Sequence, residues 1–545
     1  MGESGKDALR VGFDGEKSYR KCRLRTKKMV RMALGFTVHG LLAVIAILAA
    51  WSQTATAAQG QLSVRVTSPG MNANVSADPN TTLALAADAD APGGTIAKVE
   101  FFDGNALIGV ATRAPFQATY RPGKAQLNYT ITAKVTDAAG RSVVSSPVTC
   151  ASIGTIPWQY DSYDYEETVD QAVKNSPTPK KMLKQVRVTI PKGLATVRGI
   201  LVVANGLGGD TRDSYKQLQY GEFLYLHDFA FLGTACFDGH IESFQAMQSA
   251  VKDIAKRSNH PELINAPYAT TGFSNGGGYA GRLVSFCPDR VIASVPICAV
   301  LPRDMVSAGS SVRGPLNAAA LSTPVCSMTG ELEKNAPSLV EPVLETYRPK
   351  GALFGWMTVQ GSGHAMVGQD VLAMPMLDAA VRLRYPADAD VRKGPVKLKV
   401  LDPAAGWVAD NTSWKSGVTA IAPANEFKGD IGKTSWLLNK DIAFIYRAYA
   451  TYDRPLTIAK TRSGWYPGSN VTIVVDDSSF PNWKKIEFYD QARKLGEVTS
   501  APAQFTALNL AGGFHVFSVL GTDAQGAVRT SGPVLVIVRT LPTTH

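Results

Sequence analysis

Short segments of alternating apolar and polar residues lie near both ends of the chain. ITAKVTD at 131–137 and HVFSVLGTD at 515–523 are examples, and Gly, Asn and Asp turn residues break the pattern between such segments. A period of two in short segments is typical of strands in an antiparallel sandwich. We therefore expect one all-β sandwich at residues 60–152 and a second at 453–540.

The middle of the chain has another pattern. Amphipathic segments such as 242–258 and 375–384 alternate there with apolar runs of strand length, namely QVRVTIP, ILVVAN, FAFLGTACF, YATTGF, VIASVPIC, TPVCSMTG and LFGWMTVQ. Buried strands that alternate with helices predict a mostly parallel sheet with helices on both faces. The sequence thus predicts an α/β domain at 176–452, preceded by a linker at 153–175 that is rich in Tyr, Asp and Glu.

The last part of this α/β region, 386–452, exceeds what the sheet needs and contains Trp407, Trp414 and Trp436. We expect it to pack on the α/β domain and to shape the mouth of a site. The alternative is that its aromatic side chains belong to the core, which is the more common place for them.

The two terminal sandwiches are copies of one module. KVEFFD at 98–103 recurs as KIEFYD at 485–490, and TDAxG follows in both copies, at 136–140 and 522–526. The spacing between the two motifs differs by one residue between the copies. These segments resemble bacterial immunoglobulin-like domains. The resemblance implies a spacer or attachment role and no particular binding residue.

The first 58 residues have the pattern of a secretory leader. Ten Lys or Arg residues and four Asp or Glu residues lie in 1–31, and the apolar run 34–50 and the small residues 55–57 follow. This order is typical of a cleaved signal peptide, and an uncleaved membrane anchor is the alternative. In both cases the rest of the chain lies outside the cytoplasm. Much of the formal net charge of +11 belongs to this leader, and no basic run with interleaved aromatic residues follows it, so nucleic-acid binding is not expected.

Six cysteines are present, and Cys22 lies in the leader. The other five include no CxxC pair, so no metal site is expected. An exported chain permits a disulfide between Cys298 and Cys326, although free, buried thiols are the favoured state in a chain of this size.

Gly272-Phe273-Ser274-Asn275-Gly276 fits the pattern G-x-S-x-G. The match follows the apolar strand 268–272 and opens a helix-like segment at 276–286, whereas an ordinary Gly-rich turn would need no such context. In this position it resembles the nucleophile elbow of α/β-hydrolases. The resemblance implies that Ser274 is a nucleophile and that an acid and then a histidine follow it along the chain.

Of the seven histidines, only His364 lies downstream of Ser274 and inside the α/β region. It occupies a Gly-rich loop directly after the run LFGWMTVQ, so we expect it to be the general base.

The acid that orients the histidine is expected just after the run TPVCSMTG, where Glu331 and Glu333 both lie. We favour Glu333, because GELE resembles the G-x-x-D turn that carries the acid in many members of the family. Glu331 remains the second choice.

Two backbone N–H groups should stabilise the oxyanion. One is expected from Asn275, and the other from Leu207, because the loop NGLGG resembles the His-Gly-x-Gly-Gly loops of lipases and esterases.

Residues 176 to about 385 are therefore similar to secreted esterases of the α/β-hydrolase superfamily, such as polyhydroxybutyrate depolymerases, feruloyl esterases and acetylxylan esterases. The resemblance implies a serine hydrolase that needs no cofactor or metal and cleaves carboxylic esters through an acyl-enzyme. The flanking sandwiches favour polymeric substrates, either esterified polysaccharides or polyesters. A peptidase and a non-catalytic adhesion protein are the other readings, and the oligomeric state is left open.

Overall fold

The structure is a computed structural model of the chain. It describes residues 61–71, 73–75, 82–122, 128–152, 158–171, 178–206, 208–299, 301–302, 315–365, 368–459, 461 and 463–540. The predicted leader lies outside these ranges. Among the helices of the described part, none has the length and apolar character needed to span a membrane.

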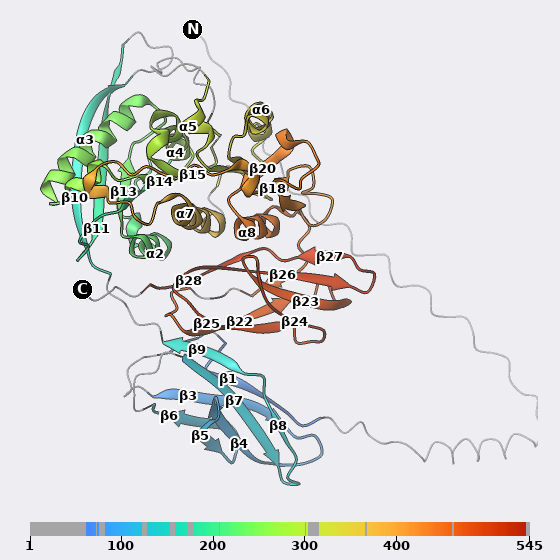
Figure 1. Ribbon diagram of the computed structural model, residues 1–545. Helices are drawn as coiled ribbons and strands as arrows, with labels where there is room; N and C mark the ends of the chain where they lie inside the picture. The colour runs from blue at the N-terminus through green and yellow to red at the C-terminus, as the bar shows by residue number, and fades with distance from the viewer. Residues whose placement is uncertain are drawn as a thin grey trace, which may run out of the picture. The chain divides into compact units, whose positions relative to one another are not determined.

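The central region contains an eight-stranded sheet in the order β10-β11-β13-β12-β14-β15-β16-β17 (Figure 1). Its strands are β10 (Tyr160–Gln171), β11 (Lys180–Pro191), β12 (Gly199–Ala204), β13 (Phe229–Ala235), β14 (Tyr268–Phe273), β15 (Val291–Ile297), β16 (Val325–Gly330) and β17 (Phe354–Val359). The first two strands pair antiparallel, and β11 pairs antiparallel with β13. All other pairs are parallel. Strands β12, β13, β15 and β16 are buried along their whole length, as expected for a sheet that is covered on both faces.

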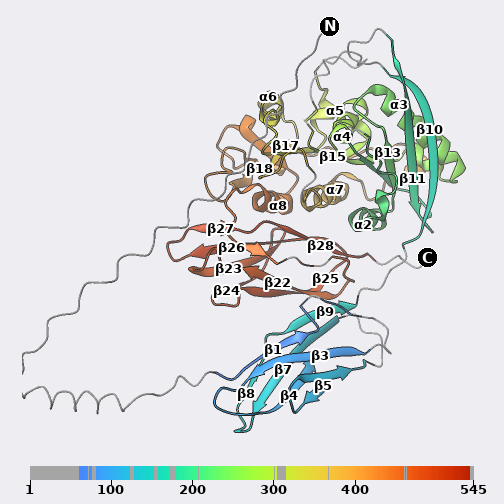
Figure 2. The same cartoon turned by 180° about the vertical axis from the view of Figure 1, so that it is seen from behind.

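Helices cover both faces of this sheet. Figures 1 and 2 show α3 and α4 on one face and α2 and α7 on the other. The helices of the region are α2 (Leu218–His227), α3 (Ile241–Arg257), α4 (Asn275–Phe286), α5 (Ala318–Leu321), α6 (Ala336–Tyr347), α7 (Asp370–Arg384) and α8 (Lys440–Ala450). The alternation of apolar runs and amphipathic segments therefore did predict this layered arrangement.

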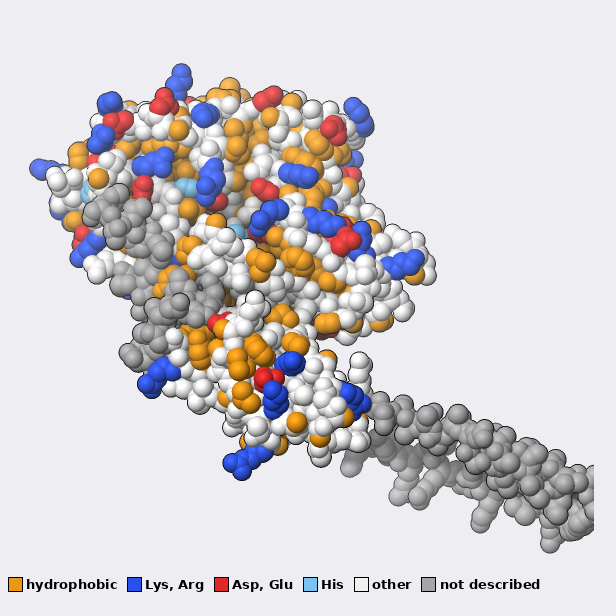
Figure 3. Space-filling view, turned by 60° about the horizontal axis from the view of Figure 1, so that its bottom comes forward, with side chains coloured by type: hydrophobic (Ala, Val, Ile, Leu, Met, Phe, Trp, Pro, Cys, Tyr) orange, Lys and Arg blue, Asp and Glu red, His pale blue; other side chains and the backbone are white. Residues whose placement is uncertain are grey.

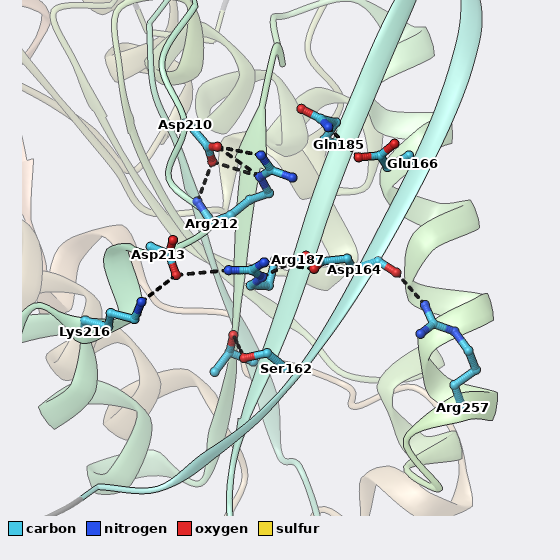
Figure 4. Close-up of polar contacts among 11 residues, drawn as sticks. Ser162, Asp164, Glu166, Gln185, Arg187, Asp210, Arg212, Asp213, Lys216 and Arg257 are labelled. Carbon is cyan, nitrogen blue, oxygen red and sulfur yellow. Dashed lines mark hydrogen bonds and ion pairs between the residues drawn. The ribbon is translucent and has the colours of Figure 1, made fainter.

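The segment expected to be a linker instead contains the edge strand β10. Its polar residues alternate with Tyr and Val, and its exposed side chains face charged partners on the neighbouring strand. Arg187 of β11 donates to both carboxylate oxygens of Asp164, at 2.7 and 2.8 Å, and to Asp213 at 3.0 Å (Figure 4). Charged side chains on an edge strand discourage pairing with other chains, which explains a strand with so polar a composition.

Residues 386–452 form a small subdomain that packs on the end of the sheet. It has three strands in the order β19-β18-β20, followed by α8. The strands are β18 (Trp407–Asp410), β19 (Ile421–Pro423) and β20 (Thr434–Leu437). Trp436 is fully buried, and the Trp414 ring packs edge-on against Trp356 of β17 at 5.1 Å. Trp436 therefore belongs to the core, as in the alternative interpretation, and Trp414 is partly buried and packs against that core.

The amino-terminal sandwich has two sheets, ordered β1-β3-β6 and β2-β9-β7-β4-β5, with β8 paired to β7. Its strands are β1 (Ser63–Ser68), β2 (Ala73–Val75), β3 (Leu83–Asp90), β4 (Ile96–Asp103), β5 (Ala106–Ala111), β6 (Phe116–Tyr120), β7 (Asn128–Asp137), β8 (Ser142–Val144) and β9 (Val148–Ser152).

The carboxy-terminal sandwich has sheets ordered β21-β22-β25 and β24-β23-β26-β27, with β28 paired to β26. Its strands are β21 (Thr457–Ile458), β22 (Ser469–Asp476), β23 (Trp483–Asp490), β24 (Arg493–Val498), β25 (Gln504–Leu510), β26 (Gly513–Asp523), β27 (Val528–Thr530) and β28 (Val534–Val538). The repeated motifs take equivalent places: KVEFFD lies in β4 and KIEFYD in β23. Each pairs antiparallel with the strand that leads into TDAxG.

The two sandwiches differ in their cores. The amino-terminal copy has a buried cluster of its own. The carboxy-terminal copy also has one, but Phe514, Val516 and Ile537 of this copy belong to the buried cluster of the central sheet.

Figure 3 shows Lys and Arg side chains interspersed with Asp and Glu side chains on one face of the molecule.

Candidate active site

Ser274 lies at the sharp bend between β14 and α4. Its backbone has φ 54° and ψ −121°, a conformation that a residue with a Cβ atom rarely adopts. Two backbone hydrogen bonds hold it: its N–H donates to the carbonyl of Ile297 at 2.8 Å, and its carbonyl accepts from the N–H of Gly278 at 2.8 Å. Strain of this kind persists where the surroundings fix it, commonly at functional sites.

The glycines of G-x-S-x-G allow the backbone segments at this bend to approach each other closely. A Cβ atom at Gly272 would lie 2.5 Å from the carbonyl oxygen of Gly276, and one at Gly276 would lie 2.3 Å from the carbonyl carbon of Ala204. No side chain fits at either position. Close backbone packing among β14, α4 and the end of β12 therefore requires both glycines of the motif.

The structure brings Ser274, His364 and Glu333 together from three separate loops. His364 Nε2 lies 2.8 Å from Ser274 Oγ, and His364 Nδ1 lies 2.5 Å from Glu333 Oε1. A ring that donates its Nδ1 proton to the carboxylate leaves Nε2 free to accept the hydroxyl proton. The arrangement can therefore activate the serine for attack on an electrophilic carbon.

The two glutamates after β16 have different partners. Glu333 Oε2 accepts from the N–H of Gly330 at 2.8 Å, which fixes the carboxylate while Oε1 meets the histidine. Glu331 Oε2 accepts from the N–H of Gly361 at 3.0 Å, and its Oε1 lies 3.6 Å from Lys415 Nζ. Glu331 therefore supports the start of the loop that carries His364, whereas Glu333 contacts the ring itself.

The predicted oxyanion donors are only partly described. Asn275 is the first residue of α4, so its N–H belongs to the first turn, where helical N–H groups have no acceptor within the helix. Leu207 lies outside the described residues. Its neighbour Gly206 lies close to the nucleophile, because a Cβ atom there would be 3.1 Å from Ser274 Cβ. The loop after β12 therefore runs past Ser274.

Cys298 is a neighbour of the site that the sequence suggested only as a disulfide partner. It follows β15, has φ 48°, and its thiol donates to the carbonyl of Ala365 at 3.4 Å. Burial, and secondarily the charge of Glu333, raise its pKa to about 11. All five described cysteines are free thiols, Cys326 included. The only feature of the sequence that indicates this place is that Cys298 directly follows the apolar run of β15, the strand that pairs with β14.

Comparison with known proteins identifies one part of the chain. Residues 63–140 match the family model of the bacterial Ig domain. This match covers most of the amino-terminal sandwich, as the resemblance drawn from its motifs implied. No curated protein matches the chain significantly.

Three solved structures illustrate the local likenesses. Poly(aspartic acid) hydrolase-1 from Sphingomonas sp. KT-1 is 14% identical over 40% of this chain and 98% of its own, with a TM-score of 0.30. The feruloyl esterase module from Clostridium thermocellum is 14% identical over 40% of this chain and 87% of its own, with a TM-score of 0.27. The fibronectin(III)-like modules of CbhA from Clostridium thermocellum are 26% identical over 16% of this chain and 94% of their own, with a TM-score of 0.15. Likenesses with scores this low carry no functional argument.

Proposed function

We propose that residues 176–452 form an α/β-hydrolase domain that hydrolyses carboxylic esters, with Ser274 as nucleophile, His364 as base and Glu333 as the acid. The observation that carries this proposal is the continuous hydrogen-bond chain from Ser274 Oγ through the imidazole to Glu333, starting at a strained turn. An accidental serine would need neither the strained backbone nor the glycines around it.

The sheet order supports the same assignment. Ser274 follows β14, Glu333 follows β16 and His364 follows β17, and these strands are parallel within one sheet. The carboxyl ends of parallel strands meet at one edge, where α/β folds commonly have their sites. The chain order of serine, acid and histidine is the order found in α/β-hydrolases.

The proposed reaction has two halves. Ser274 Oγ attacks the ester carbonyl while His364 Nε2 takes the hydroxyl proton, and the imidazolium then protonates the leaving alkoxide. In the second half, His364 activates a water that releases the acid from the acyl-enzyme. Glu333 holds the ring and stabilises its charged form, while the N–H groups of Asn275 and Leu207 are the proposed donors to the oxyanion.

We further propose that the protein is exported and that its substrates are polymeric esters. The leader pattern supports export, and the bacterial Ig domain at 63–140 is of a kind suited to spacing or attachment. Esterified polysaccharide is the first candidate and a polyester is the second. Acid release from acetylated xylan, feruloylated arabinoxylan and polyhydroxybutyrate would separate them.

The decisive experiment compares p-nitrophenyl acetate and butyrate hydrolysis by the wild type, Ser274→Ala and Ser338→Ala. Ser338 is an exposed residue of α6 whose hydroxyl bonds to the carbonyl of Asn335, which makes it a matched control. We expect Ser274→Ala to lose activity by about 10⁴-fold or more and Ser338→Ala to match the wild type. Equal rates for all three proteins would leave the adhesion reading in place.

A further inference from the structure

Three metal-binding side chains meet behind the nucleophile. Cys298, Glu333 and His364 each offer one ligand atom, and the three atoms all lie within 4.8 Å of one another. A tetrahedral zinc ion with bonds of about 2.0–2.3 Å needs its ligand atoms roughly 3.3–3.8 Å apart. The cluster is therefore close to the spacing that such an ion requires.

We propose that this cluster is an inhibitory binding site for Zn²⁺, in which the metal enters between His364 and Glu333 with the sulfur of Cys298 as third ligand. Thiolate, imidazole and carboxylate together favour a borderline cation such as Zn²⁺ over Mg²⁺ or Ca²⁺, which prefer oxygen ligands alone. The fourth position is left to water.

The structure leaves room for the small movements that binding needs. His364 Nδ1 and Glu333 Oε1 are 2.5 Å apart and must separate by somewhat less than 1 Å to bond to one ion. The His364 side chain is 52% exposed, and a loop carries it. The thiol of Cys298 donates to the carbonyl of Ala365 at 3.4 Å, a hydrogen bond that costs little to break. The carboxylate of Glu333 keeps its bond from Gly330 through the other oxygen.

Binding of the ion releases one proton. The thiol proton of Cys298 goes to solvent, and the resulting charges on sulfur and carboxylate balance the dication. The imidazole stays neutral: Nδ1 binds the metal, and the single ring proton moves to Nε2, which faces Ser274 Oγ. A ring that already carries a proton on Nε2 cannot accept the hydroxyl proton, so the base is lost.

The inhibitory consequence rests on the proposed function, whereas binding of the metal does not. We therefore design two measurements. The first follows p-nitrophenyl butyrate hydrolysis during titration with ZnCl₂ in a buffer that does not chelate metals. We expect kcat to fall, with KM little changed, and full recovery on addition of EDTA.

Cysteine variants identify the ligand in this assay. Each variant is compared with its own rate in the absence of metal. Cys298→Ala should raise the half-inhibitory zinc concentration by at least about tenfold, in keeping with the 10–100-fold cost of weakening a metal site. Cys298→Ser provides a second test if the alanine variant folds poorly. Cys236→Ala, which removes an exposed thiol at the end of β13, should keep the wild-type sensitivity.

The second measurement needs no activity. Co²⁺ is added to Ser274→Ala, and the near-ultraviolet absorption of a thiolate-to-cobalt bond is recorded, with Ser274→Ala/Cys298→Ala as control. A band that requires Cys298 supports the site even if no ester is ever cleaved. No band in Ser274→Ala, or equal zinc sensitivity of wild type and Cys298→Ala, would overturn the proposal.

Discussion

A Cβ atom at Gly330 would lie 2.2 Å from the carbonyl oxygen of Gly363, the residue before His364. The end of β16 and the histidine loop are therefore in direct backbone contact, with no space for a side chain between them. Gly330 also donates its N–H to Glu333, so a single glycine contacts both the histidine loop and the carboxylate that meets the imidazole.

Gly330→Ala tests this contact. The added methyl group must push the histidine loop away, and a displacement of about 1 Å at a catalytic group can cost on the order of 10²-fold in rate. We expect kcat for p-nitrophenyl butyrate to fall by about that factor. The matched control is Gly278→Ala, because a Cβ atom there meets nothing within 4 Å. A wild-type kcat for Gly330→Ala would show that the loop relaxes without consequence.

Separate replacement of the two glutamates with glutamine should distinguish their roles. Glu333→Gln removes the negative charge behind the imidazole and is expected to lower kcat by two to four orders of magnitude, roughly the range seen when a triad acid becomes an amide. Glu331→Gln keeps an acceptor for the N–H of Gly361 and should change kcat less than about threefold. Steady-state kinetics on one short ester measures both. A larger loss of kcat in Glu331→Gln than in Glu333→Gln would indicate that Glu331 is the acid that orients the histidine.

Trp414→Ala should affect stability more than substrate choice. The ring packs against Trp356, whose Nε1 donates to Thr329 at 2.8 Å inside the core. We expect the free energy of unfolding to fall by about 2–4 kcal/mol, somewhat less than for a fully buried aromatic because Trp414 is partly buried, and KM for short esters to stay unchanged. Tyr452→Ala removes a half-exposed aromatic for comparison. Thermal melts measure the change in stability, and Michaelis–Menten kinetics on several short esters measure substrate preference. An altered ester preference at an unchanged melting temperature would show that Trp414 shapes the mouth of the site.

The pH dependence of stability should change when Glu222 of α2 is replaced. Burial raises the pKa of this carboxyl to about 7, although Thr540 donates to it through both its N–H and its hydroxyl. A raised pKa means that the native state holds the proton more tightly than the unfolded chain. The contribution to stability is therefore present below the ordinary pKa of 4.5 and is lost as the pH rises through about 7.

Glu222→Gln keeps the shape and an acceptor but cannot ionise. The melting temperature of the wild type relative to this variant should decrease between pH 5 and pH 8. Differential scanning calorimetry of both proteins across this range gives the comparison. A constant difference in melting temperature would show that Glu222 does not titrate there.

The sequence was sufficient for the parts of the site that depend on order along the chain. G-x-S-x-G required a strand before it and a helix after it, and both are present around Ser274. His364 followed by elimination, because no other histidine lies downstream within the α/β region. Its contact with Ser274 needs only that β14 and β17 end at the same edge.

Other features could not be read from order alone. Glu331 and Glu333 are separated by one residue, and only the turn in which the Glu333 N–H bonds to the Gly330 carbonyl decides which carboxylate meets the ring. The polar composition of β10 predicts a linker, although the alternation of Tyr with charged residues in this segment is also a strand pattern. The role of Cys298 depends on side-chain proximity between β15, β16 and β17, which no spacing along the chain encodes.

The two copies of the repeated module differ in how their buried residues relate to the central sheet. Because Phe514, Val516 and Ile537 complete the interior of the central sheet, a protein truncated after residue 452 would leave apolar surface uncovered and should be prone to aggregation. The amino-terminal copy has a separate hydrophobic cluster of its own residues. Of the duplicated pair, it is therefore the copy whose exchange or deletion should leave the fold of the α/β region intact.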